Sequence, residues 1–587
     1  MRTLTAVAHT IAFVCVFFGA LPLVTAVAQF LLVGLERYRR IYDHLVPHMP
    51  RTAVLIPARD EAAVLTTSID ALLSSAYPAG RLRVFVIDDA STDDTPAVLA
   101  RLAAAHPGAV VHLRRETGGQ GKAHTLNHGL RTVLSDTWAE AVLVMDADVV
   151  FTPDTVWRMT RHLADPEVGA VTAYIQEGSG SRGNYLTRYI AYEYITAQAA
   201  ARRTQNVLGA VACLAGGAQL HSRANLEAIG GEFDTGTLAE DTVTTFESQL
   251  AGHRVVFDGY ALVLAEEPDN VAGLWRQRLR WARGNYQVTR RYRRLWFRGR
   301  LAGDHRLGSW LFGLIWFSVL LTPFLMLLSA ASLLFLFYTD TSRSWFAFQA
   351  LWVVNLVSYL FVTLLSLAVD PVTARRCWRE ALIFPGLVSC FFLVVTAVPS
   401  VTLPWLDGLG LGLTRDSPHP LMLFAYCWLA LCMPLAWAAK FLTGTRLRWL
   451  SAPIIHLVGY GSLLAACSLS AFLLQIRGAE QSWGRTVKTG KVREPDPATA
   501  PATAPGADPA APPPEPATGR PGTQPAHPTG TDVRAEESGG LTDDDLTRRF
   551  TTKTRRDAER DRGLLWWQAG VMAFLALLMI LREIWLV

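Results

Sequence analysis

Charged residues are scarce in this chain, and cysteine pairs of the kind that hold zinc are missing. Of its 587 residues, 18% are charged and 51% are hydrophobic, and the mean hydropathy is +0.22. The seven cysteines form no Cys-x-x-Cys pair and most lie in apolar stretches, which argues against a zinc site or a disulfide framework. A net charge of +5 gives no case for a nucleic-acid partner. The composition instead predicts a membrane protein with a soluble part.

Seven apolar runs are near or above the roughly 20 residues that a membrane-spanning helix requires, although the fourth is marginal. They are residues 11–35, 307–338, 345–369, 381–398, 421–439, 450–476 and 564–587. The first run has the look of a signal peptide, but its apolar stretch is too long and basic residues follow it instead of a convincing cleavage site. We therefore expect residues 1–45 to be a retained N-terminal transmembrane anchor and residues 307–480 to be a transmembrane bundle.

Basic residues beside the apolar runs indicate orientation, because cytoplasmic loops are enriched in arginine and lysine. They cluster at residues 37–40, 375–379, 440–448 and 477–493. The first three clusters agree with alternate crossing and with a cytoplasmic location for the segment after the first run. The last cluster also favours the cytoplasm, so both ends of the run 450–476 look cytoplasmic. Either this run is re-entrant, which Pro453, Gly459 and Gly461 would permit, or one earlier run does not cross.

Residues 46–285 have the mixed composition of a globular domain. Apolar β-rich runs such as "TAVLIPARDE", "RVFVIDDASTDD" and "EAVLVMDADVVF" alternate with segments of helical periodicity. This alternation predicts an α/β domain with a mostly parallel sheet covered by helices on both faces. Such sheets bind ligands at the carboxyl ends of their strands. Asp88, Asp89, Asp146 and Asp148 fall there.

The aspartates of "MDAD", Asp146 and Asp148, suit a hard divalent cation, because a positive partner offsets the desolvation of acids at a strand end. An isolated Asp-x-Asp is more often a solvated turn. What favours the cation site is a series of accompanying motifs between residues 57 and 281. In chain order these are "PARDE", "VIDDASTD", "GGQGKAHTLNHGL", "MDAD", "GGAQLHSR", "LAED" and "QRLRW".

This series closely resembles the family-2 glycosyltransferases with a GT-A fold. Within them it looks like the processive membrane branch, which contains cellulose, chitin, hyaluronan and poly-N-acetylglucosamine synthases. The resemblance covers the soluble domain and, more loosely, the membrane region that follows. The pentapeptide Gln-x-x-Arg-Trp at residues 277–281 is its most specific element, since it marks the polymerising members.

The resemblance implies a nucleotide-sugar site at the strand ends. Glu61 of "PARDE" and Asp89 of "VIDDAS" would hold the uridine, with Asp88 beside them. Lys122 of "GKAHTLN" would meet the nucleotide or its phosphates. A lysine alone would be a surface residue, but its place within this motif favours the functional role.

The same resemblance assigns the metal and the base. Asp146 and Asp148 would bind Mg²⁺ or Mn²⁺ and the nucleotide, with Asp148 as the direct ligand; Asp241 of "LAED" would be the general base and Glu240 would face the acceptor. A carboxylate near the acceptor hydroxyl can take its proton, and a cation neutralises the charge that develops on the leaving diphosphate. The family usually has threonine before Glu-Asp, where this chain has Ala239, which puts local hydrogen bonding in question.

Gln277 and Arg280 would contact the diphosphate, Arg280 by charge-assisted hydrogen bonds, and Trp281 would offer its ring to the acceptor sugar. A tryptophan in an amphipathic stretch is more often a core residue or an interfacial anchor, but the place of Trp281 directly after Arg280 favours the acceptor role. Residues 286–306 alternate basic and aromatic side chains, which predicts amphipathic helices at the membrane surface.

The segment 481–493, with "SWGRTVKTGK", resembles the cytoplasmic gating loop of the same synthases, which closes over the nucleotide. Trp483, Arg485, Thr486 and Lys488 would make its contacts. The alternative is a basic strip attracted to anionic lipid. Residues 494–562 form a Pro/Ala-rich stretch and a basic segment that cannot bury a core, which predicts a disordered linker. Residues 563–587 would be a C-terminal transmembrane helix.

These features predict a multi-pass protein of the cell membrane with a cytoplasmic catalytic domain. It would extend a β-linked polysaccharide from a UDP-sugar, with inversion, and pass the polymer outward through its own helices. UDP-N-acetylglucosamine is favoured over UDP-glucose, and accessory export or modifying proteins are conceivable partners. One alternative is a non-processive transferase that glycosylates a lipid once. Another, from a different class, is a catalytically silent membrane scaffold.

Overall fold

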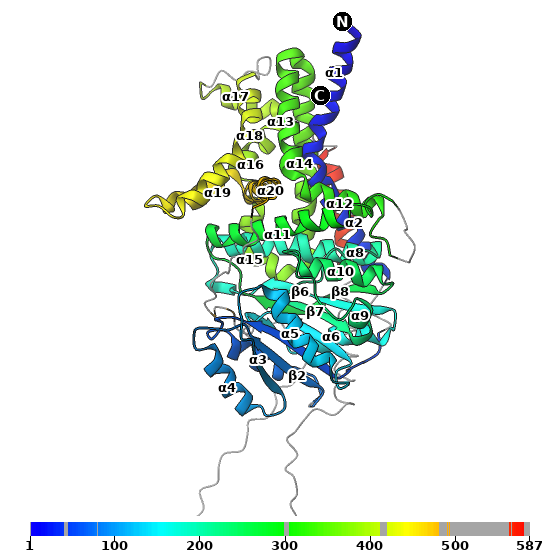
Figure 1. Cartoon of the computed structure of the whole chain (residues 1–587). Helices are drawn as coiled ribbons and strands as arrows, with labels where there is room; N and C mark the ends of the chain where they lie inside the picture. The colour runs from blue at the N-terminus through cyan, green and yellow to red at the C-terminus, as the bar shows by residue number, and fades with distance from the viewer. Residues whose placement is uncertain are drawn as a thin grey trace, which may run out of the picture.

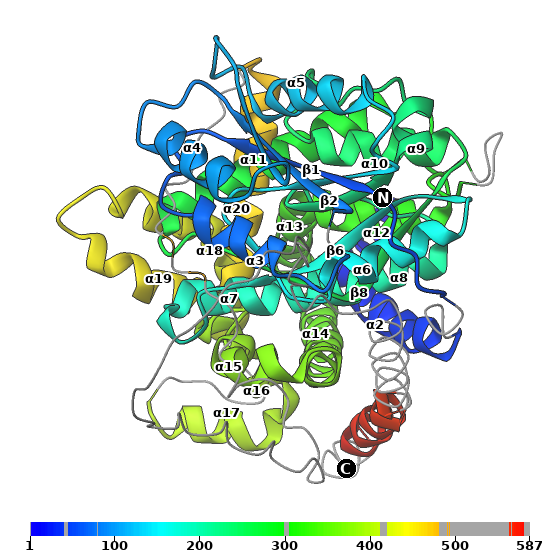
Figure 2. The same cartoon turned by 90° about the horizontal axis from the view of Figure 1, so that it is seen from below.

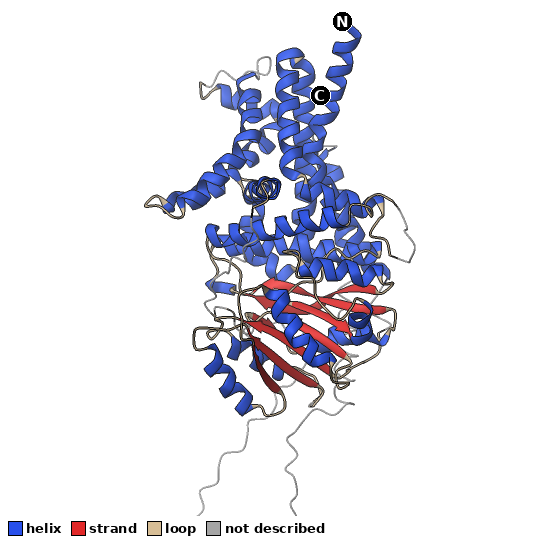
Figure 3. Cartoon of the chain, in the orientation of Figure 1, coloured by secondary structure: helices blue, strands red, loops and turns tan. Residues whose placement is uncertain are grey.

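Strands gather at one end of the molecule and apolar helices at the other (Figure 1, Figure 3). The computed structural model describes residues 2–39, 45–78, 80–298, 305–410, 419–479, 490, 492, 563–564 and 566–579. A layer of more polar helices lies between the two ends. The α/β domain and the helical bundle expected from the sequence are therefore distinct parts of one structure.

One sheet of eight strands forms the centre of the domain, in the order β3-β2-β1-β4-β7-β6-β8-β5. The strands are β1 (Thr52–Ala58), β2 (Leu82–Asp88), β3 (Val110–Arg114), β4 (Ala141–Met145), β5 (Val149–Phe151), β6 (Val168–Glu177), β7 (Ala218–Ser222) and β8 (Arg254–Ala265). The β3-β2-β1-β4 half is parallel, whereas β7 is antiparallel to both its neighbours and β5 to β8. Strands β6 and β8 are parallel as well, so the sheet is mixed but mostly parallel, as predicted.

Strand β1 is apolar throughout because helices cover both faces of the sheet. Val54 and Ile56 join the core that includes α3 and α4, while Ala53 and Leu55 join the core under α5. Figure 2 shows β1 and β2 between α3 and α5. The domain helices are α3 (Leu65–Leu73), α4 (Thr95–Ala105), α5 (Lys122–Leu134), α6 (Thr155–Thr160), α9 (Arg223–Ala228) and α10 (Glu240–Leu250).

The layer between sheet and bundle consists of α7 (Tyr185–Tyr194), α8 (Ala201–Leu208) and α11 (Val271–Arg291) (Figure 1). A π-helical turn joins α7 to α8. The segment 286–306, predicted to form amphipathic helices, comprises the end of α11 and then turns through residue 297; residues 299–304 lie outside the described part. Helix α11 therefore leads directly from the sheet to the bundle.

The bundle contains helices long and apolar enough to cross a membrane, by length and composition. Four stretches qualify within the described residues: Thr3–Arg37, Thr322–Thr339, Thr341–Val369 and His419–Leu442. The number rises to six if each of two bent helix pairs is one span. The bundle helices are α1 (Arg2–Val16), α2 (Leu21–Arg39), α12 (Trp310–Leu320), α13 (Thr322–Thr339), α14 (Thr341–Val369), α15 (Pro371–Leu382), α16 (Leu387–Ala397), α17 (Pro399–Asp407), α18 (His419–Leu442), α19 (Ser451–Val458) and α20 (Tyr460–Ile476).

The two bent pairs break at glycines that contact each other. Helices α15 and α16 meet at 79° near Gly386, and α19 and α20 meet at 103° at Gly459. The backbone N–H of Tyr460 donates to the carbonyl of Phe384 at 3.0 Å, so one break supplies a hydrogen bond to the other. The break at Gly459 lies inside the run for which glycine and proline suggested a re-entrant path. A broken span and a re-entrant loop both fit this geometry.

Buried polar contacts connect the α/β domain to the bundle. Arg203 of α8 pairs with Glu36 of α2 at 3.3 Å, with side-chain exposures of 3% and 0%. Asp370, between α14 and α15, accepts hydrogen bonds from Tyr174 at 3.0 Å and from Gln176 at 2.7 Å. The first contact joins α8 to α2, and the second joins strand β6 to the start of α15, so two separate contacts connect the domain to the bundle.

Candidate active site

Asp88 and Asp89, at the end of β2, have different surroundings. The Asp88 carboxylate is fully buried; it pairs with Arg114 at 2.6 Å and accepts from the backbone N–H of Ser91 at 2.8 Å. Asp89 accepts from the backbone N–H of Gly119 at 2.8 Å. It also pairs with two arginines, Arg115 and Arg59. Asp88 thus holds its own loop in place, while Asp89 joins the loops that follow three strands.

Glu61 lies on the loop after β1, next to the loop after β2. Its backbone N–H donates to the hydroxyl of Thr95 at 2.8 Å. The preceding Asp60 has a positive φ of 53° and accepts from the N–H of Thr92 at 2.7 Å. These bonds tie the two loops together, so Glu61 and Asp89 belong to one edge of the sheet, as expected from parallel neighbours.

Lys122, the first residue of α5, stands at the centre of the site. Its ammonium pairs with Asp146 at the end of β4 and donates to the carbonyl of Gly216 at 2.8 Å. A Cβ added to Gly216 would lie 3.2 Å from both the Lys122 ammonium and the Asp241 carboxylate, so this glycine leaves the space in which those groups approach. Burial alone would lower the pKa of Lys122, but Asp146, Glu240 and Asp241 outweigh it and raise that pKa.

Glu240 and Asp241 open helix α10 and complete the cluster. Acidic residues in the first turn are stabilised by the positive end of the helix dipole. Glu240 is only 3% exposed. Burial and the neighbouring Asp241 raise the pKa of Glu240 to about 7, even though Lys122 and Arg280 pull it down. The pair therefore contains a carboxyl group that titrates close to neutrality.

The Gln-x-x-Arg-Trp motif lies on α11, where contacts orient two of its side chains. Gln277 donates to Glu267 at 3.0 Å and accepts from Arg278 at 2.7 Å. The Arg278 guanidinium lies 4.1 Å from the centre of the Trp281 ring and pairs with Glu193 at 2.7 Å. Arg278, one of the two unspecified positions in the motif, thus holds both its glutamine and its tryptophan.

The structure brings most of the expected residues to one edge of the sheet. Lys122 and Asp146 are in direct contact, the charges of Glu240 and Asp241 act on Lys122, and Arg280 lies close enough to Glu240 to affect its pKa. Asp148 follows Asp146 in the turn between β4 and β5. Trp281 packs against the core while keeping part of its surface accessible. The roles expected for these residues from the sequence stay predictions.

Several neighbours of the site were not assigned a role from the sequence. Gly216 lies in the quoted motif "GGAQLHSR", so the motif pointed to it, but only the fold shows that its carbonyl accepts from Lys122. Arg115 and Arg278 carry no sequence signal that separates them from the other arginines. The proposed gating residues Trp483, Arg485, Thr486 and Lys488 lie outside the described residues.

The donor groups in the site suit a divalent cation bound together with a diphosphate. Asp146 and Asp148 supply two carboxylates at the end of β4, and Mg²⁺ or Mn²⁺ commonly takes one or two carboxylates plus phosphate oxygens. Among the described residues, no group of three or more His, Cys, Asp and Glu side chains is arranged to hold a metal alone. The Lys122 ammonium lies beside Asp146, where a metal ion would otherwise bind. The site therefore favours positive charge.

Comparisons with known proteins show what the α/β domain is similar to. Residues 50–284 match the family model described as "Glycosyltransferase like family 2". The probable glycosyltransferase YdaM of Bacillus subtilis (strain 168) is 26% identical over 354 residues, which cover 58% of this chain and 81% of that protein. The β-monoglucosyldiacylglycerol synthase of Synechocystis sp. (strain ATCC 27184 / PCC 6803 / Kazusa) is 31% identical over 41% of this chain and 49% of its own length.

A third relative is a polymer-forming enzyme. The poly-β-1,6-N-acetyl-D-glucosamine synthase of Staphylococcus aureus (strain COL) is 26% identical over 42% of this chain and 57% of its own length. The chain therefore spans most of the first relative but only about half of each of the other two.

Proposed function

We propose that this chain, whose residues 50–284 form a family-2 glycosyltransferase domain of a nucleotide-sugar-dependent enzyme, is a processive β-glycosyltransferase of the cell membrane. It polymerises a polysaccharide from a UDP-sugar, with UDP-N-acetylglucosamine favoured over UDP-glucose, and delivers the product into its own helices. The observation that carries this proposal is that Lys122, Asp146 and Asp241 lie with Glu240 near Arg280 of α11, the helix that also contacts the bundle.

The donor lies along the edge formed by β2, β1 and β4. Glu61 and Asp89 hold the uridine, and Lys122, Gln277 and Arg280 hold the diphosphate. Asp146 and Asp148 are the residues that would bind a divalent cation, which neutralises charge on the leaving diphosphate. With the diphosphate bound, the Lys122 ammonium has a second anionic partner besides Asp146, and Arg280 adds charge-assisted hydrogen bonds to the same group.

The acceptor reaches the donor from the side of α11. Asp241 takes the proton of the acceptor hydroxyl, while Glu240 hydrogen-bonds the acceptor sugar and Trp281 supports its ring. Because Arg278 is stacked on the Trp281 ring and paired with Glu193, the platform is fixed before the sugar arrives. In-line attack on an α-linked donor gives a β-linked product.

The contacts between α11 and the bundle support export of the product through the helices. Arg283 donates to the carbonyl of Ala479 at 2.6 Å, just past the end of α20, and the Tyr286 ring packs edge-on to Phe472 at 5.2 Å. The helix that carries the acceptor platform is thus packed against the bundle within two turns of Trp281. A polymer that leaves the platform has the apolar helices as its nearest neighbour.

A second candidate function is a single transfer to a membrane lipid. The 31% identity to a β-monoglucosyldiacylglycerol synthase favours it, because that protein glycosylates a lipid with a comparable domain. Both candidates share the donor site and the base. They differ in how many sugars one acceptor receives.

The decisive experiment measures product length. Purified full-length protein in nanodiscs is incubated with radiolabelled UDP-sugars and Mg²⁺ or Mn²⁺, and products are separated on a gel before and after digestion by linkage-specific glycosidases. We expect a ladder or a high-molecular-weight polymer from UDP-N-acetylglucosamine that disappears when EDTA is added. One sugar per lipid molecule would establish the second candidate instead.

Two groups of variants separate the roles at the site. Asp241→Asn and Asp148→Asn should nearly abolish transfer while the protein remains folded and inserted. Full biological effect in such variants would favour a scaffold over an enzyme. Trp281→Ala should impair elongation more than hydrolysis of the donor, and equal loss of both reactions would argue against its acceptor role.

A further inference from the structure

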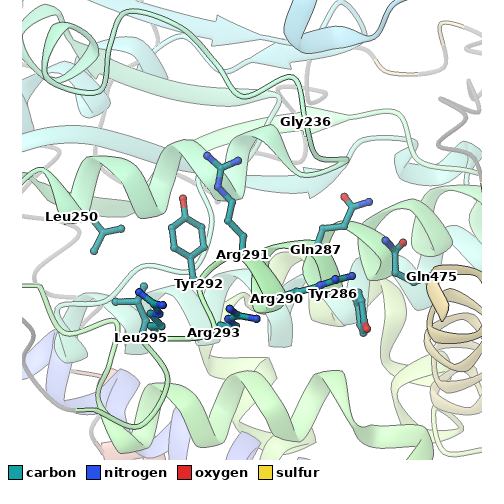
Figure 4. A pocket seen from close by; sticks show the side chains of 11 residues that line it. Gly236, Leu250, Tyr286, Gln287, Arg290, Arg291, Tyr292, Arg293, Leu295 and Gln475 are labelled. Atoms are coloured by element: carbon teal, nitrogen blue, oxygen red, sulfur yellow. The ribbon is translucent and has the colours of Figure 1, made fainter. Parts of the chain in front are cut away.

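A cavity of about 650 Å³ lies at the far end of α11, away from the transfer site (Figure 4). Its lining comes from the end of α11, the turn after it, α10 and α20; the residues are Gly236, Leu250, Tyr286, Gln287, Arg290, Arg291, Tyr292, Arg293, Arg294, Leu295 and Gln475. Arg290 is ten residues beyond Arg280, a distance of about 15 Å along the helix. The cavity is therefore separate from the diphosphate position.

The lining is strongly basic, and most of its charge has no partner. Arg291 pairs with Asp234 at 2.7 Å and with Glu247 at 3.0 Å. Arg290, Arg293 and Arg294 are exposed, and no ion pair or hydrogen bond joins their side chains to any described residue. Three guanidinium groups at one opening repel each other unless an anion lies among them, so the charges favour an anionic ligand.

Two buried polar atoms of the cavity wall can donate to a ligand. The side-chain N–H₂ of Gln287 makes no hydrogen bond among the described residues, and the buried hydroxyl of Tyr292 has the Glu247 carboxylate as its neighbour. An unpaired buried donor is costly, so such atoms usually have a ligand or a water. Burial raises the pKa of Tyr292 to about 12, which keeps its hydroxyl protonated and able to donate. The wall thus offers neutral donors beneath the cationic rim.

The cavity lies at the level where the α/β domain meets the apolar helices (Figure 1). The following residues are rich in aromatic side chains: the rings of Trp296 and Trp316 stack at 5.2 Å, and Trp310, at the start of α12, is 72% exposed. Tryptophan gathers at membrane–water interfaces, where the phosphates of lipids are found. The location therefore distinguishes a lipid phosphate from a soluble one.

We propose that this cavity binds the phosphate of an anionic phospholipid, with Arg290, Arg293 and Arg294 around the headgroup. Guanidinium groups bind phosphate oxygens in a bidentate manner, and basic residues near an anionic leaflet attract its lipids. Tyr292 and Gln287 donate to the remaining headgroup oxygens. The headgroup would thus lie at the opening of the cavity, with the acyl chains toward α12.

The cavity wall is connected to the loop that carries the proposed base. Gln287 accepts from the backbone N–H of Leu238 at 2.9 Å, three residues before Asp241, and Arg291 holds Asp234 at the start of the same loop. A bound headgroup would stiffen this wall and with it the loop. Resting on the proposed function, this connection implies that anionic lipid increases the transfer rate.

Binding is tested first, without reference to activity. Full-length protein in nanodiscs of phosphatidylcholine, with or without phosphatidylglycerol, is released into detergent, and the lipids that remain bound are identified by native mass spectrometry. We expect phosphatidylglycerol to be retained at least tenfold over phosphatidylcholine. The triple variant Arg290→Gln, Arg293→Gln, Arg294→Gln should lose this preference and retain both lipids about equally, because the guanidinium groups that attract the phosphate are gone. Equal retention of both lipids by the wild type would overturn the proposal.

The matched control removes the same charge elsewhere in the bundle region. The variant Arg375→Gln, Arg446→Gln, Arg448→Gln replaces three exposed arginines at helix ends outside the cavity. It should keep the preference, because the cavity is intact. Loss of the preference in both variants would assign it to overall charge and overturn a specific site. All six side chains are exposed, so the folds of both variants are preserved.

Two further experiments are needed. One tests whether the cavity binds a lipid or a soluble anion, and the other tests whether lipid binding is independent of catalysis. Inorganic phosphate at 10 mM, supplied to the protein in detergent, should leave the retained lipid in place; displacement by it would show a soluble-anion site and overturn the lipid assignment. Donor hydrolysis is then measured in both nanodiscs. Retained lipid without any transferase activity would refute the proposed function and leave the lipid site standing.

Discussion

A single lysine lies among three carboxylates at the centre of the candidate site. Lys122 contacts Asp146 directly, and Glu240 and Asp241 act on its charge from the other side. Without it, three acids would face each other in a largely buried space, and each would have to stay protonated or repel the others. At the residue scale, the site therefore depends on a balance between the positive charge of Lys122 and the negative charges of the acids. Removing the positive charge should destabilise it.

Replacing Lys122 with methionine should reduce both stability and activity. The change keeps the length of the side chain but leaves Glu240, which is buried, and the partly exposed Asp146 and Asp241 without their cation. We expect a lower midpoint of thermal unfolding in detergent and at least a hundredfold loss of transfer. Lys122→Arg, which keeps the charge, should recover most of the midpoint but not the rate. Equal midpoints for the methionine variant and the wild type would contradict this balance.

The raised pKa of Glu240 predicts that the stability of the folded protein depends on pH. Its pKa is about 7 in the folded chain against 4.5 in the reference state, raised mainly by burial. Between these values the unfolded chain loses the proton while the folded chain keeps it, so this group's contribution to stability falls as pH rises from 4.5 to 7 and stays low above 7. The full loss amounts to about 3 kcal/mol.

Glu240→Gln removes this titration. The difference in unfolding midpoint between the variant and the wild type should therefore shift in favour of the variant between pH 5 and pH 8. Differential scanning fluorimetry in detergent at several pH values measures it. A constant difference across this range would show that Glu240 does not titrate there.

Part of this site could be predicted from the sequence and part could not. Asp89 and Asp146, at strand ends, and Asp241, at the start of α10, lie in short motifs whose residue types indicate their chemistry. The roles of Arg115, Arg278 and Gly216 depend on contacts between segments far apart in the chain, such as the carbonyl of Gly216 and the ammonium of Lys122. Only the fold brings such pairs together.

At the scale of elements, the crossing of the two broken helix pairs stands out. A Cβ on Gly386 would lie 2.5 Å from the backbone of residues 457 and 458, and a Cβ on Gly459 would lie 2.4 Å from Pro385. Both glycines have positive φ, 92° and 89°. Backbone contacts backbone here, so neither side can move aside as a flexible side chain would.

Gly386→Ala and Gly459→Ala should each destabilise the bundle by several kcal/mol, through the contact and the backbone conformation together. Gly461→Ala is the matched control, because its Cβ would meet only a side-chain atom of Phe384 at 3.8 Å. Resistance to proteolysis of the membrane-inserted protein measures the effect. Similar resistance in all three variants would refute the importance of this crossing.

The bundle helices and one of the two breaks could be predicted from the sequence, but the other break could not. Apolar runs located the bundle helices, and the glycines of residues 450–476 pointed to the break at Gly459. The break near Gly386 was not expected, because the run 381–398 was treated as one marginal span. Apolar composition reports burial in lipid or protein but not the direction of the chain, so a sharp bend inside an apolar run leaves little trace in hydropathy.

At the scale of the whole molecule, buried ion pairs fix the α/β domain to the bundle. Arg203 and Glu36 are 167 residues apart in sequence, and both are almost fully buried. Neither residue was predicted to have this role, because charge pairing across such a separation has no local pattern. The attachment keeps the edge of the sheet in a constant position relative to the helices.

Glu36→Ala should destabilise the molecule by about 3–5 kcal/mol, because it leaves the Arg203 guanidinium buried without its carboxylate. The exposed pair Arg131–Glu232, with side-chain exposures of 60% and 61%, provides the control, and Glu232→Ala should change stability by less than about 1 kcal/mol. Thermal unfolding in detergent compares the two variants. If they behave alike, the buried pair is not a principal attachment.

The ion pair between Lys122 and Asp146 has a consequence for the order in which ligands bind. A cation arriving alone must compete with an ammonium already seated on the carboxylate, whereas a cation arriving with a diphosphate brings that ammonium a replacement partner. Uptake of the two is therefore expected to be strongly cooperative. Titration of Mn²⁺ with and without nucleotide should show weak binding of the ion by itself, and Lys122→Met should erase the difference.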